Sequence, residues 1–256
     1  MSKILAALVF CCCAIALTSA KPHIDGRIVG GVDAIDGTFP YQVSLRKSGS
    51  HTCGGSIIST RYVLSAAHCV GYSNDDDEYV IYDANLYTIR AGSTNRLSGG
   101  VVSRVAEIIV HGEYGNFLHD FSLLRLETPL IFSKNIKAIT LASSEVPTGE
   151  TVVISGWGRL TTYGDIPTKL QWNTVKSLSK LSCLTSIGMF SDSLLCLAHP
   201  SGNGACFGDS GGPAAYQGKL VGVASFVING CGSSSPDAYA MVSNHLDWIR
   251  KHSDVV

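Results

Sequence analysis

Short runs of β-branched and aromatic residues make up most of this sequence, and they constrain its fold more than any other feature. Clusters of Gly, Ser, Asn and Pro separate the runs, and long amphipathic helical patterns are scarce. Such runs, interrupted by frequent turn signals, are typical of an all-β barrel or sandwich. We expect strands within Tyr41–Leu45, Ser56–Ile58, Tyr62–Ser65, Leu86–Arg90, Ile108–Val110, Leu123–Leu126, Thr151–Ile154 and Leu220–Ser225.

The C-terminal segment has a different periodicity. Val242, Leu246 and Ile249 recur at i, i+4 and i+7, and Arg250 and Lys251 follow in the last turn. This spacing predicts a short helix that buries one face and carries cations at its negative end. The chain as a whole is 45% hydrophobic with a net charge of −1. It can therefore bury a core, and its charge gives no reason to expect binding to nucleic acid or an anionic membrane.

The first 20 residues have the features of a secretory signal peptide. Lys3 supplies a positive charge, Ile4–Leu17 is apolar, and Thr18–Ala20 offers small residues for cleavage. A permanent signal anchor is the alternative, but a membrane-spanning helix needs about 20 apolar residues, more than this run provides. We therefore predict that residues 1–20 are removed and that the protein is secreted and extracellular.

Secretion determines which cysteines remain in the mature protein and favours their pairing as disulfides. Cys11, Cys12 and Cys13 leave with the signal peptide, and the cysteines that remain are Cys53, Cys69, Cys183, Cys196, Cys206 and Cys231. An even number in an oxidising compartment predicts three disulfides, although many pairings are open. A zinc site is the weaker alternative, because no close Cys-x-x-Cys pair remains. We predict no metal and no cofactor.

One segment surrounds a serine with glycine. It reads Gly208-Asp209-Ser210-Gly211-Gly212-Pro213. Glycine on both sides of a serine lets the backbone approach a substrate closely and adopt dihedral angles that other residues avoid. A Gly-Ser-Gly cluster is more often a flexible turn, but a run of this composition favours a nucleophile.

Three other segments contain groups that could work with this serine. His68 is followed by Cys69, so a disulfide could hold the backbone beside the imidazole. Asp120 opens a strand-like run, and if it is buried it needs a donor such as an imidazole N–H. Arg27 precedes Ile28, and cleavage between them would free an α-amino group. Each residue alone also has an ordinary structural explanation.

Taken in this order, the four segments resemble the trypsin/chymotrypsin family of serine proteases. The resemblance covers residues 28–256 and includes Ser155–Gly158 and the C-terminal helix. It implies an all-β fold of two packed six-stranded antiparallel Greek-key β-barrels with a C-terminal α-helix. The first barrel would span about residues 40–135, the second about 136–240 and the helix about 241–253.

The resemblance also implies a role for each residue. His68 would take the proton of Ser210 as that oxygen attacks the scissile carbonyl, and would later protonate the leaving amine. Asp120 would hold the imidazole in the correct tautomer. The backbone N–H groups of Gly208 and Ser210 would form the oxyanion hole. The implied activity is that of a serine endopeptidase.

Activation and disulfide pairing follow from the same resemblance. An activating protease would cut after Arg27 and release the propeptide, residues 21–27. The new ammonium of Ile28 would then pair with the carboxylate of Asp209. The resemblance also selects one pairing of the cysteines: Cys53–Cys69, Cys183–Cys196 and Cys206–Cys231.

The predicted substrate pocket departs from that of trypsins. Its residues would be Gly204, Ala205, Phe207, Ser225, Phe226, Val227 and Asp237. Gly204 stands where trypsins carry the Asp that binds Arg or Lys, and Val227 would narrow the mouth as in elastases. Asp237 stands where many members have Gly. Its carboxylate would reach the pocket base from the other side, as in crustacean collagenolytic proteases.

These departures leave the specificity open. The small and apolar residues favour a chymotrypsin-like or elastase-like preference. Mixed or trypsin-like specificity would follow if Asp237 binds basic side chains. Alternatively, Tyr239, backbone groups or water could satisfy Asp237, which would then only shape the pocket.

A different class of function is a secreted, non-catalytic homologue that binds a partner. Such proteins usually lack a member of the triad, whereas His68, Asp120 and Ser210 are all present. We therefore expect a monomeric enzyme whose partners are polypeptide substrates, protein protease inhibitors and the activating protease. The propeptide is too short to be a targeting domain, so digestion, for example in a gut lumen, is the expected role.

Overall fold

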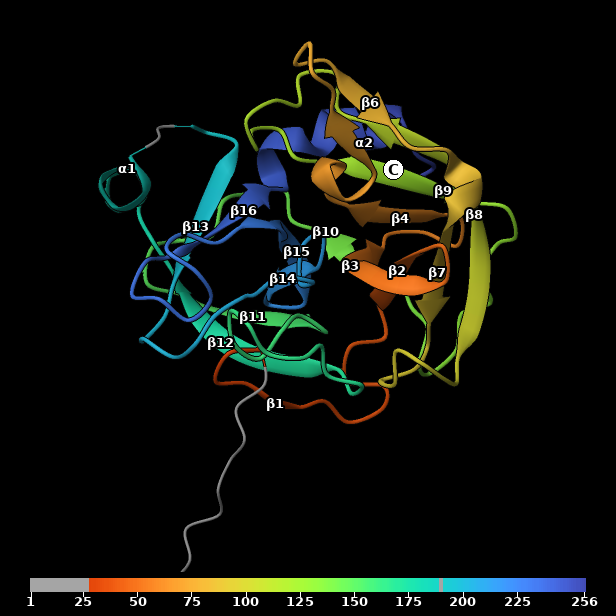
Figure 1. Cartoon of the computed structure of the whole chain (residues 1–256), viewed down its shortest axis with the longest axis horizontal. Coiled ribbons are helices and arrows are strands. Elements are labelled where there is room, and N and C mark those ends of the chain that lie inside the picture. The colour runs from red at the N-terminus through yellow and green to blue at the C-terminus, as the bar shows by residue number, and fades with distance from the viewer. Residues whose placement is uncertain (1–27, 189–190) are drawn as a thin grey trace, which may run out of the picture.

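The computed structural model describes residues 28–188 and 191–256. Two β-barrels lie side by side, the first on the right of Figure 1 and the second on the left. The predicted signal peptide, the propeptide and Arg27 lie outside the described residues. The all-β fold of two six-stranded antiparallel barrels is confirmed.

The first barrel closes in the order β2-β3-β4-β9-β8-β7, and each strand is antiparallel to its neighbours. Its strands are β2 (Gln42–Lys47), β3 (Ser50–Ile57), β4 (Tyr62–Ser65), β7 (Tyr87–Ala91), β8 (Val101–Val110) and β9 (Ser122–Leu126). Leu45, Ile57, Leu64, Ile89 and Leu124 are fully buried inside it. Closure leaves no free edge through which another chain could pair.

The second barrel follows the order β12-β11-β14-β15-β16-β13, and pairing of β13 with β12 closes it. Its strands are β11 (Thr151–Gly156), β12 (Gln171–Ser177), β13 (Leu194–Ala198), β14 (Pro213–Tyr216), β15 (Lys219–Phe226) and β16 (Asp237–Met241). Two short strands extend the sheet: β1 (Val32–Asp33) pairs with β12, and β10 (Thr140–Leu141) pairs in parallel with β15.

The remaining elements are short. Strands β5 (Gly71–Ser73) and β6 (Tyr79–Ile81) form a hairpin, and 3-10 turns occupy Ala67–Cys69, Ala84–Leu86 and Ser243–His245. Helix α1 (Lys180–Ile187), which the sequence analysis did not predict, is capped at its start by the Ser179 side chain. It ends at Gly188, whose left-handed backbone (φ 71°) suits glycine.

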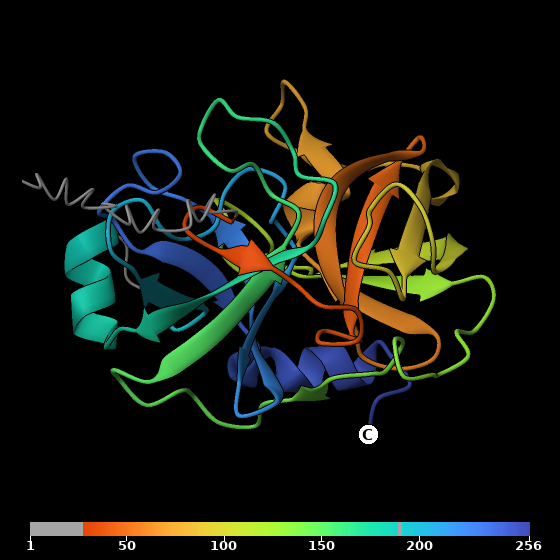
Figure 2. The same ribbon diagram turned by 90° about the horizontal axis from the view of Figure 1, so that it is seen from below.

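The C-terminal segment joins the two barrels. Its last helix, α2 (Leu246–Lys251), lies within the predicted range and continues the third 3-10 turn. Ile249 is fully buried in a cluster that contains residues of both barrels, such as Leu124 and Leu220. In Figure 2 this helix crosses beneath the two barrels. The apolar face that the sequence periodicity predicts therefore packs against both barrels and holds them together.

All eight predicted strand segments overlap strands of the structure. The unpredicted strands include β14 and β16, which contain small residues and begin with Pro213 and Asp237. Their extended conformation depends on pairing within the barrel, because strand propensity is largely a matter of packing context.

The cysteines form three disulfides, Cys53–Cys69, Cys183–Cys196 and Cys206–Cys231, which are the same pairs that the resemblance implies.

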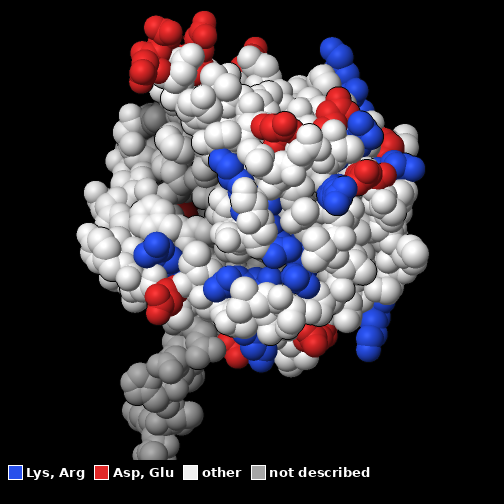
Figure 3. Space-filling model, turned by 45° about the vertical axis from the view of Figure 1, so that its right-hand side comes forward, with Lys and Arg blue, Asp and Glu red and all other residues white. Residues whose placement is uncertain are grey.

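Among the described residues, no helix is long and apolar enough to cross a membrane. Figure 3 shows one face on which acidic side chains gather at a corner and basic side chains form a short central band. Both signs of charge are therefore present on that face.

Candidate active site

The candidate catalytic residues come from both barrels. His68 lies in the 3-10 turn that follows β4, and Asp120 lies just before β9 of the same barrel. Ser210 lies in the loop between β13 and β14 of the second barrel. His68 and Ser210 line a common cavity, so the junction of the barrels brings the predicted nucleophile and base together.

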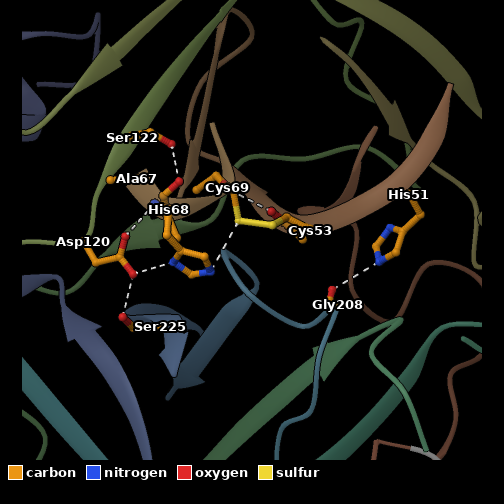
Figure 4. Close-up of a disulfide and its surroundings, with 12 residues drawn as sticks. His51, Cys53, Ala67, His68, Cys69, Asp120, Ser122, Gly208 and Ser225 are labelled. Atoms are coloured by element: carbon orange, nitrogen blue, oxygen red, sulfur yellow. Dashed lines mark hydrogen bonds and ion pairs between the residues drawn. A yellow bond between two sulfur atoms is a disulfide. The ribbon is translucent and has the colours of Figure 1, made fainter. Parts of the chain in front are cut away.

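The carboxylate of Asp120 is fully buried and accepts three hydrogen bonds. The His68 ring donates from Nδ1 to Oδ2 at 2.7 Å, and the His68 backbone N–H donates to Oδ1 at 3.0 Å. The Ser225 hydroxyl donates to Oδ2 at 2.5 Å. Because a carboxylate only accepts, the neutral imidazole carries its proton on Nδ1 and presents a lone pair at Nε2. Figure 4 shows His68 between Asp120 and the Cys53–Cys69 disulfide.

The surroundings of His68 limit the positions of its ring. The disulfide fixes the next residue, and Nε2 lies 3.9 Å from the sulfur of Cys69. Phe117 packs edge-on against the imidazole, with 5.6 Å between ring centroids. Only 21% of the His68 side chain is exposed. The His68 ring is thus held in place at the side of the cavity.

The loop before Asp120 is held by the C-terminal segment. His245 Nδ1 lies 2.7 Å from the carbonyl oxygen of Met241 and therefore donates to it, which leaves Nε2 as an acceptor. His119 Nδ1 donates to that nitrogen at 2.9 Å. This contact supports His119 in a left-handed conformation (φ 51°) immediately before Asp120.

The loop around Ser210 uses glycine where its backbone requires it. Gly208 has φ 101° and Gly211 has φ 76°, values that residues with a side chain rarely adopt. The carbonyl of Ser210 accepts from the N–H of Gly54 at 2.7 Å, and the Gly211 N–H donates to Ala224 at 2.7 Å. The serine backbone is therefore tied to a strand of each barrel.

His51 supports the same loop and was not identified from the sequence. Its Nε2 donates to the carbonyl of Gly208 at 3.1 Å, and its Nδ1 accepts from the Ser44 hydroxyl at 2.8 Å. Burial lowers the pKa of His51 to about 4, so the ring is neutral at physiological pH. No local pattern distinguishes this histidine, because its partner Gly208 is remote in the sequence.

Asp209 is a buried carboxylate next to Ser210. Its two oxygens accept backbone N–H groups of Gly158 at 2.7 Å and Cys206 at 3.0 Å. A Cβ on Gly158 or Gly156 would lie within 2.2 Å of these oxygens, so both glycines make room for the carboxylate. Burial raises the pKa of Asp209 to about 7, and the two hydrogen bonds only partly oppose this effect.

This shift predicts how the stability of the intact chain changes with pH. A folded-state pKa above the ordinary 3.8 makes folding less favourable as pH rises from about 4 to about 7. D209N lacks this titration, so its free energy of unfolding relative to wild type should increase by about 4 kcal/mol over that range. Chemical denaturation of both proteins across the range measures the difference.

Other titrating groups change the free energy of unfolding in the opposite direction as pH rises. Their contributions are the same in D209N and in wild type, so they cancel in the difference between the two proteins. His51 is one such group, because its lowered pKa makes folding more favourable as the pH rises from about 4 to about 6.5. A constant difference between D209N and wild type at all pH values would contradict the prediction.

A cavity of about 490 Å³ opens beside Ser210. It is lined by His68, Phe117, Ala205, Cys206, Phe207, Ser210, Ala224, Ser225, Phe226, Val227, Ala238 and Tyr239. Of the predicted pocket residues, Gly204 and Asp237 are not among the lining residues. Asp237 is buried behind the wall, where it accepts the N–H of Ala205 at 2.6 Å. Phe117 is an addition from the first barrel, and its ring contacts that of Phe226.

A family model described as Trypsin matches residues 28–249. The chain belongs to the trypsin family. It is 46% identical over 231 residues to the serine protease SP24D of Anopheles gambiae, covering 90% of this chain and 83% of that protein. It is 38% identical to trypsin alpha of Drosophila melanogaster, covering 97% of each.

A solved structure of neuropsin, a serine protease expressed in the limbic system of mouse brain, has the same trypsin-family fold. Its TM-score is 0.78 at 29% identity, covering 86% of this chain and 97% of neuropsin. With this family membership, the protein is a serine endopeptidase that acts on polypeptides. The Asp120–His68 contact has the arrangement that a trypsin-family enzyme uses to activate serine.

Proposed function

We propose that this serine endopeptidase is a secreted digestive enzyme that prefers an uncharged, apolar or aromatic side chain before the cleaved bond. The observation that carries the proposed preference is the lining of the cavity beside Ser210. Alanines, aromatic residues and Val227 dominate it, and no ionised carboxylate is among its lining residues. An apolar side chain would lose its contact with water there without leaving a buried charge unpaired.

We further propose that the enzyme is made as an inactive precursor that is cut after Arg27. Two observations support this part of the proposal. Ile28 is almost fully buried in the core cluster that contains Ala205 of the pocket wall. Asp209 is buried with only neutral hydrogen-bond donors, so a new ammonium at Ile28 would relieve the cost of its charge.

The chemistry would proceed through an acyl-enzyme. His68 Nε2 accepts the proton of Ser210 as the serine oxygen attacks the carbonyl carbon, and Asp120 stabilises the imidazolium that forms. The N–H groups of Gly208 and Ser210 would hold the oxyanion. Among the described residues, neither of these N–H groups donates to another backbone or side-chain acceptor. The imidazolium then protonates the leaving amine, and water repeats the sequence to release the acid.

A basic preference is the second candidate. Trypsins are among the relatives, and the carboxylate of Asp237 lies directly behind Ala205 of the pocket wall. A lysine or arginine side chain could gain from this negative charge if nothing else neutralised it.

A peptide-library cleavage profile separates the two candidates. We expect the activated enzyme to cleave after Leu, Met, Phe or Tyr with kcat/KM at least about tenfold above that for Arg or Lys, because a basic side chain would enter an apolar cavity. The S210A variant, produced and processed in the same way, controls for contaminating proteases. A profile dominated by Arg and Lys would overturn the proposed preference.

A further inference from the structure

A buried pair of ionisable residues lies behind the pocket wall. His199 follows strand β13, and Asp237 begins strand β16. Their side chains are 0% and 4% exposed, and His199 Nε2 lies 3.2 Å from Asp237 Oδ2. Nε2 forms no regular hydrogen bond among the described residues. The contact is an ion pair when His199 is protonated, and its attraction is then mainly one of charge.

The pair is close enough to the substrate to affect what enters the pocket. Asp237 Oδ2 accepts the N–H of Ala205 at 2.6 Å, and Ala205 and Ala238 both line the cavity. A Cβ at Gly204 would lie 2.4 Å from the His199 ring and 2.5 Å from the Asp237 carboxylate. Gly204 therefore leaves room for the ion pair, in addition to lacking the carboxylate of trypsins.

The charges around the pair favour a protonated His199. Burial lowers the pKa of His199, but the Asp237 carboxylate and, to a smaller extent, the Pro200 carbonyl raise it, and the net shift is upward. The other groups that face this region are the Asp209 carboxylate and the Tyr239 hydroxyl. Burial raises the pKa of Tyr239 well above its ordinary value, so this hydroxyl stays neutral. No cation of the described residues other than His199 lies within ion-pair distance of Asp237.

We infer that His199 sets the specificity of the pocket by neutralising Asp237, so that the wall presents no net charge to the substrate. This inference deepens the proposed apolar preference and names the residue responsible for it. Without His199 the carboxylate would be buried and unpaired, which is strongly unfavourable. A lysine or arginine side chain of the substrate could then supply the missing cation. His199 contacts no substrate and acts through Asp237, as a positioning and neutralising residue.

The test compares H199Q with wild type in the activated enzyme. Glutamine retains a polar side chain of similar size but carries no charge. We expect the ratio of kcat/KM for an Arg substrate to that for the matched Leu substrate to increase by about 10- to 100-fold in H199Q. Concentrations are fixed by fluorophosphonate titration of Ser210, so that misfolded protein is not counted. The double variant H199Q/D237N should return the ratio to the wild-type value or below.

The pH dependence of this ratio gives a readout that a purely structural role would not change. A pH effect on the catalytic step itself changes kcat/KM for both substrates alike and cancels in the ratio. In wild type the ratio should rise as pH increases and His199 loses its proton. It should lie above the wild-type value in H199Q, and it should be low in D237N, without the rise that accompanies loss of the His199 proton. If H199Q does not fold, the loss of the slope in D237N still tests the inference.

The outcomes separate this inference from the proposed preference. A wild-type enzyme that cleaves mainly after Arg and Lys overturns the preference alone, provided that H199Q raises the ratio further. A wild-type enzyme that prefers Leu, with the same ratio and pH slope in H199Q and D237N, overturns the role of His199 and leaves the preference standing.

Discussion

Replacing Ser210 with alanine is expected to lower kcat of the activated enzyme by about a millionfold. The substitution removes the oxygen that forms the acyl-enzyme, while the Asp120–His68 contact at 2.7 Å and the cavity remain. Peptide substrates should therefore still bind. Hydrolysis of a peptide anilide, and binding of the same peptide measured by fluorescence anisotropy, would report the two effects separately.

The double variant S210A/H68A provides a stringent control for this prediction. If the two residues act as a unit, removing His68 in addition to Ser210 costs little more than removing Ser210 alone. Losses that multiply in the double variant would show that the two side chains act independently. Residual turnover of S210A near the wild-type level would place the nucleophile elsewhere.

Replacing Asp209 with asparagine is expected to lower kcat/KM of the cleaved enzyme by about a thousandfold, even with Ser210, His68 and Asp120 unchanged. The neutral amide of the new side chain cannot form the proposed ion pair with an Ile28 ammonium, so under this proposal the loop that carries the N–H groups of Gly208 and Ser210 loses its support. Each oxyanion donor is worth about 10²- to 10³-fold in rate. The measurement is steady-state kinetics after cleavage at Arg27 has been verified by N-terminal sequencing.

The variant I28V is the matched control, because it keeps the ammonium and most of the buried apolar volume of Ile28. It should retain activity within a few fold, whereas the uncleaved wild-type chain should be as slow as D209N. Near-normal turnover of cleaved D209N would refute the proposed activation by an Ile28–Asp209 pair.

The candidate catalytic residues are predicted from short segments of the sequence, whereas the lining of the pocket depends on contacts between remote segments. Ser210, His68 and Asp120 lie in segments whose residue types and order are specific to one family, and that family is shown. Phe117 and His51 could not be found in this way. Phe117 lines the pocket because its loop in the first barrel faces the second, and His51 supports Gly208 across the junction of the barrels. Neither contact leaves a local pattern in the sequence.

The helix that was not predicted has a similar explanation. Helix α1 has a Ser179 cap and ends at Gly188, but its short apolar pattern does not define a buried face. Only Cys183 in this helix is buried, and its disulfide with Cys196 attaches the helix to strand β13. The position of α1 therefore depends on a covalent contact with a strand that follows it in the sequence.

By itself, the sequence determined the all-β class and the family, and it predicts which residues would carry the chemistry, because each is encoded in short segments of specific composition. Only the tertiary structure decided the charge behind the pocket wall. The register that pairs Leu197 with Asp237 brings the start of β16 beside the end of β13, where His199 follows. An ion pair depends on the distance between two charges in space. The sequence contains both residues, and the closed barrel determines that they meet.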